Sequence, residues 1–264
     1  MIPEKFAPRK FLSQNFLINQ RVIERIIEVC DLKKDDVVLE IGPGRGALTR
    51  DIAKRVQELI VIERDERLVQ ELEKREEAHL KVIHADVLRY PLENLPQHLK
   101  VIGNLPYHIA TPIVERLIGL RHHLRDVYIM LQWEHGQRLI AKPHTKDYGS
   151  LSCFVQYYTI PKILFKISSA AFSPRPKVDS CFLHLKLLEK PFQKAKDEDL
   201  LFKIIRQAFS QRRKMIQNSL SPLIPKERLL PLLKELNVEP EKRAENLRLE
   251  DYVRIGNALT EAHP

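Results

Sequence analysis

Asn104-Leu105-Pro106-Tyr107 is the stretch of this chain whose residue types could do chemistry on a planar base. The amide oxygen of Asn104 and a nearby backbone carbonyl could accept the protons of an exocyclic amine, such as adenine N6, and hold its nitrogen in line with a reactive methyl group. Pro106 restricts the residue before it and so fixes the direction of the Leu105 carbonyl. Tyr107 offers a face on which an extruded base could stack. Such a stretch would act mainly by positioning the reactants.

The same four residues could form an ordinary turn, because Asn-x-Pro is common turn chemistry. They directly follow an expected buried strand, however, and two other expected strands separate that strand from a glycine-rich turn. This position favours a site over a simple turn.

The glycine-rich turn, Glu40-Ile41-Gly42-Pro43-Gly44-Arg45-Gly46, closes one expected strand and opens a helix. Gly42 and Gly44 would let the backbone turn sharply and approach a ligand without a Cβ in the way. The spacing is G-x-G-x-G rather than the G-x-G-x-x-G of dinucleotide-binding proteins, and the lysine of a phosphate loop is missing. A purely structural tight turn is the alternative.

Two carboxylates follow at the ends of the next two expected strands. Glu63 comes about 20 residues after Gly42, near the spacing at which a carboxylate accepts hydrogen bonds from ribose hydroxyls. Asp86 would accept from the adenine amine of a bound nucleoside. Each carboxylate alone could be a strand-end cap or a solvated charge, but the ordered series predicts a cofactor that carries a nucleoside. NAD remains open on this pattern, and Asn104 to Tyr107 favour S-adenosylmethionine.

These loops need a sheet to hold them, and near-continuous apolar runs alternating with helical patterns predict a parallel one covered on both faces. A helix is expected from Gln20 to Cys30, and two later strands are expected to complete the sheet in antiparallel fashion. The strands are expected at Val37 to Gly42, Leu59 to Glu63, Lys81 to Asp86, Lys100 to Asn104, Val127 to Leu131, Ser152 to Ile167 and Val178 to Leu188.

A polar linker opens at Lys190-Pro191, and the rest of the chain has helical patterns. The predicted fold is therefore α/β, a Rossmann-like sheet over residues 1–189 with a small all-helical C-terminal domain over residues 190–264. The expected helices of that domain run from Leu200 to Leu220, Lys226 to Leu236 and Leu249 to Leu259.

The composition is that of a globular protein with a basic surplus. The 264 residues are 44% hydrophobic and 30% charged, with a formal net charge of +9, which would attract polyanions. No apolar run reaches the roughly 18–20 residues of a membrane span, and Met1 to Lys5 lack the apolar core of a secretory signal. Neither the cysteines nor the histidines have metal-ligand spacing, so no metal is expected. Free thiols at Cys30, Cys153 and Cys181 favour a reducing, cytoplasmic location.

Further motifs join those above: Phe11 to Leu17, Val61 to Glu63, Ala171 to Ser180, Phe209 to Leu220 and Arg243 to Asn246. Together they resemble the KsgA-type ribosomal RNA adenine dimethyltransferases over nearly the whole chain. Mild departures are Ser13, where the family usually has glycine, and Arg175, where some relatives have proline.

The resemblance implies a cofactor site for S-adenosylmethionine at Asn15, Leu17, Gly42, Gly44, Glu63, Asp86 and Asn104. It implies that Asn104, Leu105, Pro106 and Tyr107 hold the target adenine, with Phe172 stacked on its other face; Phe172 could equally be a core aromatic. The implied reaction adds two methyl groups to each of two adjacent adenosines near the 3′ end of small-subunit (16S) ribosomal RNA. The implied substrate is the immature pre-30S particle, with a role in ribosome biogenesis, and a monomer is expected.

The basic residues of the helical domain fit an RNA partner. Arg212, Arg213 and Lys214 are expected on consecutive helical positions, where with Arg206 they would contact phosphates. A solvated helix face is the alternative.

Three other functions stay open. Erm-type enzymes, which methylate one adenine of large-subunit RNA, typically have isoleucine at the Leu105 position and lack the Gln211 to Lys214 motif. DNA adenine methyltransferases would have Asn-Pro-Pro-Tyr or Asp-Pro-Pro-Tyr. A ribosome-assembly factor would not need methyl transfer for its cellular role.

Overall fold

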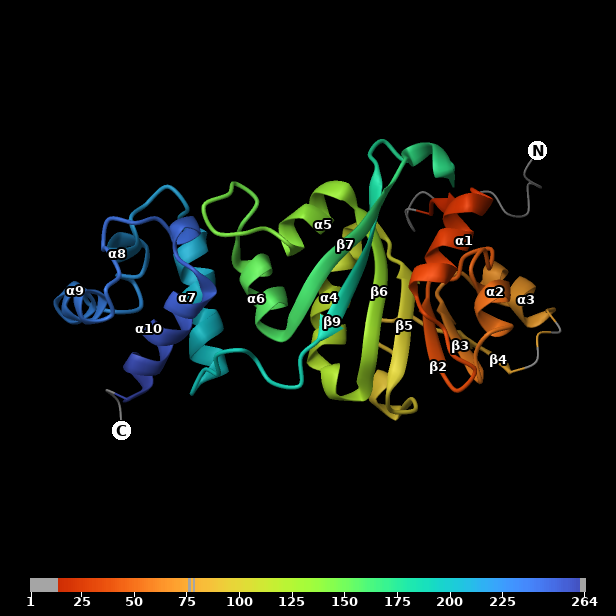
Figure 1. The fold of residues 1–264 in the computed structure, drawn as a ribbon, viewed down its shortest axis with the longest axis horizontal. Helices are drawn as coiled ribbons and strands as arrows, with labels where there is room; N and C mark the ends of the chain where they lie inside the picture. The colour runs from red at the N-terminus through yellow and green to blue at the C-terminus, as the bar shows by residue number, and fades with distance from the viewer. Residues whose placement is uncertain (1–13, 76, 78, 262–264) are drawn as a thin grey trace. The chain divides into compact units, whose positions relative to one another are not determined.

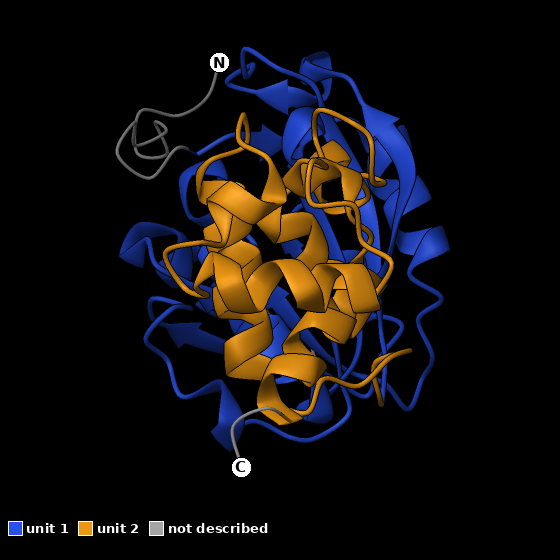
Figure 2. Ribbon diagram, turned by 90° about the vertical axis from the view of Figure 1, so that its left-hand side faces the viewer, with its two compact units in different colours: residues 1–136, 160–189 blue, residues 137–159, 190–264 orange. Residues whose placement is uncertain are grey.

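A computed structural model of the chain describes residues 14–75, 77 and 79–261. Phe11 to Ser13, the first part of one family motif, and Met1 to Lys5 lie outside the described residues. The described chain forms two compact units, which Figure 2 shows in different colours. The sheet unit comprises the residues up to 136 and residues 160–189, and the helical unit comprises residues 137–159 and those from 190 onward. The break at 189/190 lies where the sequence predicted a domain boundary, but residues 137–159 belong to the helical unit.

The sheet unit is built on seven strands in the order β4-β3-β2-β5-β6-β9-β7, which Figure 1 shows from one edge to the other. Strands β2 to β6 pair in parallel and β9 is antiparallel to β6, so the predicted Rossmann-like class is confirmed. The strands are β2 (Val37–Ile41), β3 (Glu58–Glu63), β4 (Leu80–His84), β5 (Leu99–Asn104), β6 (Leu124–Gln132), β7 (Thr159–Ile167) and β9 (Ser180–Leu187).

Helices cover both faces of this sheet because alternate strand residues on either face are apolar. Ile26 of α1 and Ile52 of α2 pack in one buried cluster with Val38 and Val61, while their strand neighbours Leu39 and Ile62 are buried on the opposite face. The helices that begin in this unit are α1 (Gln20–Val29), α2 (Thr49–Ala53), α3 (Glu66–Glu73), α4 (Ala110–Gly119) and α5 (Trp133–Leu139).

A second, two-stranded sheet ties distant parts of the same unit together. Strand β1 (Phe16–Leu17) pairs antiparallel with β8 (Phe172–Ser173), and the backbone nitrogen of Ile18 donates to the Ala171 carbonyl at 2.9 Å. The segment before α1 is thereby fixed to the loop before β9.

The helical unit has an aromatic core. Rings of Phe154 and Tyr157 pack edge-to-face against Phe202, and the Tyr157 and Tyr158 hydroxyls donate to the Glu198 carboxylate at 3.2 and 2.6 Å. No helix among the described residues has the length and hydropathy to cross a membrane. The helices are α6 (Ser150–Tyr158), α7 (Glu198–Ser210), α8 (Ile216–Ser219), α9 (Lys226–Glu235) and α10 (Leu249–Glu261).

The strand expected from Ser152 to Ile167 is wrong in its first half, where the chain forms α6 and turns into β7 only at Thr159. The aromatic residues of this stretch favour a strand locally. As a helix they present their rings to α7, and Ser152 Oγ accepts from the Gly149 nitrogen at 3.0 Å, which caps the first turn. Tertiary packing overrides the local preference.

The helix expected from Leu200 to Leu220 is also interrupted. Helix α7 ends at Ser210, a turn closes through a 2.9 Å bond from the Lys214 nitrogen to the Gln211 carbonyl, and α8 follows. Backbone pairing of Met215 with Arg243 and a 2.6 Å bond from the Ile216 nitrogen to the Lys242 carbonyl draw the chain away from the helix axis. Arg212, Arg213 and Lys214 therefore lie on a turn, not on consecutive helical positions.

Candidate active site

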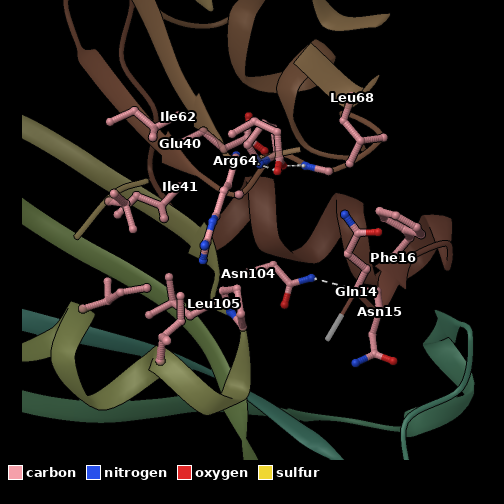
Figure 3. A pocket seen from close by; sticks show the side chains of 18 of the residues that line it. Gln14, Asn15, Phe16, Glu40, Ile41, Ile62, Arg64, Leu68, Asn104 and Leu105 are labelled. Carbon is pink, nitrogen blue, oxygen red and sulfur yellow. Dashed lines mark hydrogen bonds between the residues drawn. The ribbon is translucent and has the colours of Figure 1, made fainter. Parts of the chain in front are cut away.

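The site begins where the strand order reverses. Strand β2 lies between β3 and β5, so the chain leaves β2 toward one side and returns on the other, which opens a crevice at the carboxyl ends. Ile41 is the register partner of Gly103, and this pairing brings the glycine turn and Asn104 next to one another. A pocket at this place is lined by every cofactor residue that the sequence predicted: Asn15, Leu17, Gly42, Gly44, Glu63, Asp86 and Asn104. Figure 3 shows the pocket from close by, with Asn15 and Asn104 labelled.

The glycine turn has the backbone shape that its composition predicts. Gly42 and Gly44 have φ values of +65° and +58°, in the left-handed region that residues with a Cβ adopt at a cost. A Cβ on Gly42 would lie 3.4 Å from the Asn104 carbonyl oxygen, and one on Gly44 would lie 3.1 Å from the Phe16 ring. The turn is thus packed closely between the strand ends and the N-terminal segment.

The Glu63 carboxylate binds the glycine turn and has one acceptor position left for a ligand. Its carboxylate accepts from the backbone nitrogens of Arg64 at 2.8 Å, Asp65 at 2.9 Å and Gly44 at 3.1 Å. Burial raises the pKa of this carboxyl, which is 8% exposed, while the three hydrogen bonds oppose the shift. A carboxylate has about four acceptor positions, so Oε2 can take one further donor such as a ribose hydroxyl.

Asp86 lies two residues beyond the end of β4, in a loop, whereas the sequence predicted it at the end of the strand. Its Oδ1 accepts from the Leu88 nitrogen at 3.0 Å, and its Oδ2 lies 3.6 Å from Arg64 Nη1. Arg64 also lines the pocket and was missed by the sequence reasoning, because a residue just after a strand has no pattern of its own.

Glu40 lies beneath the turn and is a second residue that the sequence reasoning did not single out. Its Oε2 accepts from Thr49 Oγ1 at 2.7 Å, with both residues buried. Burial raises the pKa of Glu40 to about 7.

Asn104 ends β5 with its side chain held in one orientation. Its Nδ2 donates to the Asn15 carbonyl at 3.2 Å, and Figure 3 shows this bond between the strand end and the N-terminal segment. Because a carbonyl oxygen can only accept a hydrogen bond, the atom that faces Asn15 must be the amide nitrogen, and the amide oxygen points the other way. Among the described residues Oδ1 has no hydrogen-bond partner, so it can accept from an amino group.

Leu105 and Tyr107 continue the loop. The Leu105 nitrogen donates to the Met130 carbonyl at 3.2 Å, which keeps the loop on β6. Tyr107 opens a short 3-10 helix, and its hydroxyl lies 2.8 Å from Ser180 Oγ at the start of β9. Burial raises the pKa of the Tyr107 phenol, so it stays neutral. Ser180 was part of a family motif, but its contact across 73 residues was not predictable.

Phe172 is placed differently from its predicted stacking role. It is 3% exposed, packs in the buried cluster with Leu17 and Ile23, and does not line the pocket. The burial is a consequence of the β1–β8 pairing, in which Phe172 is the register partner of Leu17. The alternative, a core aromatic, fits this position.

The predicted RNA-contacting residues belong to the helical unit and are exposed. Arg212 differs from its neighbours because its Nη2 donates to the carbonyls of Lys146 at 2.8 Å and Tyr148 at 3.1 Å. The residues are Arg206, Arg212, Arg213 and Lys214.

A Rossmann-like sheet whose switch point holds a glycine turn, a buried carboxylate and an oriented amide is the arrangement in which this class of fold binds cofactors that carry a nucleoside. The chain matches the family "Ribosomal RNA adenine dimethylase" over residues 5–261 and belongs to it. Membership implies S-adenosylmethionine as the methyl donor.

Relatives match over nearly the full length. The chain is 38% identical over 261 residues to "Ribosomal RNA small subunit methyltransferase A" of Clostridium botulinum, covering 97% of this chain and 95% of the relative. It is 36% identical to the protein of the same name from Moorella thermoacetica, covering 98% and 95%.

Two crystal structures resemble the fold. A dimethyladenosine transferase from Plasmodium falciparum has a TM-score of 0.83 at 26% identity, covering 93% of this chain and 98% of that one. The 23S rRNA methyltransferase ErmE has a TM-score of 0.73 at 27% identity, covering 93% and 100%.

Proposed function

We propose that this chain dimethylates N6 of two adjacent adenosines near the 3′ end of small-subunit (16S) ribosomal RNA, in the pre-30S particle. It does so as a cytoplasmic monomer, and without a metal ion. The proposal depends above all on the Asn104 amide, whose Nδ2 donates to the Asn15 carbonyl and whose Oδ1 has no hydrogen-bond partner in the part of the chain that the structure describes. The relatives named small subunit methyltransferase A support the choice of RNA.

The residues of the pocket fit the cofactor on structural grounds. The two glycines of positive φ let the turn approach Phe16 and the Asn104 carbonyl, where a Cβ would crowd the pocket wall. Glu63 Oε2 has acceptor capacity left, and Asp86 lines the same pocket. Apolar side chains of Ile62 and Leu68 provide walls for an adenine ring. When bound, S-adenosylmethionine supplies a methyl group activated by its sulfonium.

In the proposed mechanism the chain positions an amine and accepts its protons. In the first transfer, Asn104 Oδ1 and the Leu105 carbonyl accept hydrogen bonds from the two N6 protons, which favours a lone pair directed at the methyl. In the second transfer, one of these two oxygens accepts from the single N6 proton that remains. Tyr107 stacks on the extruded base, and its hydroxyl bond to Ser180 holds the ring. The product ammonium loses its proton to water, so the site needs no general base. Oriented reactants can account for about 7–11 kcal/mol of barrier lowering.

We propose further that the helical unit supplies phosphate contacts through Arg206, Arg213 and Lys214, which are exposed. Arg212 would contribute both a contact and the placement of the 146–148 segment. The same binding would let the protein act in small-subunit biogenesis.

One test separates this function from its nearest rival. The similarity to ErmE makes methylation of large-subunit RNA the second candidate. Purified protein with labelled S-adenosylmethionine should methylate undermodified small subunits and leave naked large-subunit RNA unlabelled. Label in the large-subunit RNA alone would replace the proposed substrate by the rival one.

A further inference from the structure

Gln14 to Leu17, here called the N-terminal strap, lies along the pocket and is attached at both ends and in its middle. Its far end pairs with β8, its middle carbonyl at Asn15 accepts from Asn104, and its first described residue reaches α3. Every strap residue lines the pocket. The strap therefore forms part of the wall of the proposed cofactor pocket. It also orients the Asn104 amide, which would face the base.

The attachment to α3 runs through a buried carboxylate. Gln14 Nε2 donates to Asp65 Oδ2 at 2.9 Å, across 51 residues of sequence. Asp65 is 1% exposed and immediately precedes α3, where its Oδ1 accepts from the Arg67 nitrogen at 3.2 Å as a helix N-cap. Its own backbone nitrogen donates to Glu63, so the same residue touches the ribose-accepting carboxylate.

Arg67 keeps Asp65 ionised and in place. The guanidinium donates from Nε to Oδ1 at 3.0 Å and from Nη2 to Oδ2 at 2.7 Å. Burial alone would raise the pKa of Asp65, but the bonds from Arg67 and Gln14 outweigh it and lower the pKa to about 2. A charged acceptor of fixed geometry makes a stronger hydrogen bond to Gln14 than a neutral one would.

We infer that Asp65 is a positioning residue for methyl transfer: by holding Gln14 it fixes the strap, and through the Asn15 carbonyl it keeps the Asn104 amide in its reactive orientation. The inference rests on the proposed roles of Asn15 and Asn104. Asp65 itself is not among the residues that line the pocket. Its loss should weaken cofactor binding and slow methyl transfer together, because one segment serves both.

The chemistry of the pair allows an exchange of donor and acceptor. In Asp65→Asn, the amide oxygen can remain the N-cap of α3. The new amide nitrogen then faces both the Gln14 amide nitrogen and Arg67 Nη2, donor against donor. In Gln14→Glu, a carboxylate faces the Asp65 carboxylate. In the double variant, the new amide at position 65 donates to the new carboxylate at position 14, and the link is restored with the original total charge.

The test measures S-adenosylhomocysteine binding by calorimetry and single-turnover methyl transfer on undermodified small subunits. S-adenosylhomocysteine has an uncharged sulfur, which limits any direct effect on the ligand of the new charge at position 14. Each single variant should bind about 10-fold or more weakly and transfer more slowly, as expected for losing a hydrogen bond to a charged group. The double variant should recover to within about 3-fold of Arg67→Gln, because its position-65 amide nitrogen still cannot accept from Arg67 Nη2.

Two results would overturn the inference: single variants that bind and transfer like wild type, or a double variant as impaired as the two single losses combined. Arg67→Gln serves as a matched control, because it removes a partner of Asp65 but keeps the bond to Gln14. It should lose less binding affinity and less methyl-transfer rate than Asp65→Asn.

If thermal unfolding shows that Asp65→Asn does not fold, the result for Gln14→Glu alone tests the inference, since that variant leaves α3 unchanged. Wild-type protein that does not bind S-adenosylhomocysteine at all would instead defeat the proposed function.

Discussion

The orientation of the Asn104 side chain depends on a contact with a residue far away in the sequence. Residue types suggested that its amide oxygen accepts from an amine, but an amide presents either end equally well until something fixes it. Here the Asn15 carbonyl does so, and it comes from a segment 89 residues earlier in the chain. The orientation lowers the entropy that must be lost when the base is positioned.

Tyr107 and Ser180 provide a prediction at the scale of single residues. Tyr107→Phe and Ser180→Ala should each slow methyl transfer about 3- to 10-fold, because each removes one hydrogen bond of about 0.5–1.5 kcal/mol while the ring can still stack. If the bond is the cause, the double variant should be no slower than the slower single variant. Additive losses in single-turnover rates would mean that the two residues act separately.

At the same scale, sequence reasoning identified residues whose type is demanded by local chemistry and missed those that act across the fold. Gly42, Gly44 and Glu63 follow from the spacing of one strand–turn–helix unit and the next strand. The Tyr107–Ser180 contact depends on pairing between segments far apart in sequence, and no local pattern reports it. The Asp65–Gln14 contact is hidden for the same reason.

At the scale of elements, the parallel strands were predictable because a strand that is buried on both faces has a short, nearly continuous run of apolar residues. Helix α6 was not, because Phe154, Tyr157 and Tyr158 favour a strand until α7 offers a surface for their rings. The end of α7 was also missed, since the backbone pairing that ends it involves Arg243, well beyond the helix.

The glycine turn gives a prediction for this scale. Gly44→Ala should weaken S-adenosylhomocysteine binding about 10-fold or more, because a Cβ at a φ of +58° is strained by about 1–2 kcal/mol and meets the Phe16 ring at 3.1 Å. Gly119→Ala is the matched control. Its Cβ would have no neighbour within 4 Å, at the end of α4, so calorimetry should show wild-type affinity. Equal affinities for both variants would argue against a tight cradle.

Burial of Glu40 beneath the turn predicts a pH dependence of stability. Its pKa is about 7 in the folded protein against an ordinary value of 4.5, so the folded state holds this proton more tightly. The contribution to stability is therefore full below pH 4.5 and is lost as pH rises toward 7. The free energy of unfolding of Glu40→Gln minus that of wild type should therefore be larger at pH 8 than at pH 5, by a difference on the order of 1–3 kcal/mol. Urea unfolding without ligand measures this, and a pH-independent difference would contradict it.

At the scale of the whole molecule, the two units divide the work that the proposed function requires. The sheet unit contains the pocket and the oriented amide, and the helical unit carries exposed cations on a turn after α7. A net charge of +9 supplies a general attraction to RNA, while the turn would supply particular phosphate contacts.

This division predicts different effects for neighbouring cations. Arg213→Ala and Lys214→Ala should each weaken binding to small subunits and reduce the slope of log affinity against log salt by about 1. Arg212→Ala should also lower the thermal unfolding temperature, because its guanidinium holds two carbonyls of the 146–148 segment. Lys234→Ala, an exposed cation on α9, is the control and should leave the slope unchanged. Identical behaviour of all four variants would indicate nonspecific charge only.

In the proposed mechanism, the Asn104 to Tyr107 loop presents an adenine amine to the methyl donor. Mass spectrometry of small-subunit RNA, after incubation of undermodified subunits with purified protein and S-adenosylmethionine, tests it most directly. Wild-type protein should produce N6,N6-dimethyladenosine, and Asn104→Ala should reduce its formation about 100-fold or more, as for loss of an oriented group at a reacting centre. Folded wild-type protein that binds S-adenosylhomocysteine and forms no dimethyladenosine, or an Asn104→Ala variant as active as wild type, would contradict the account.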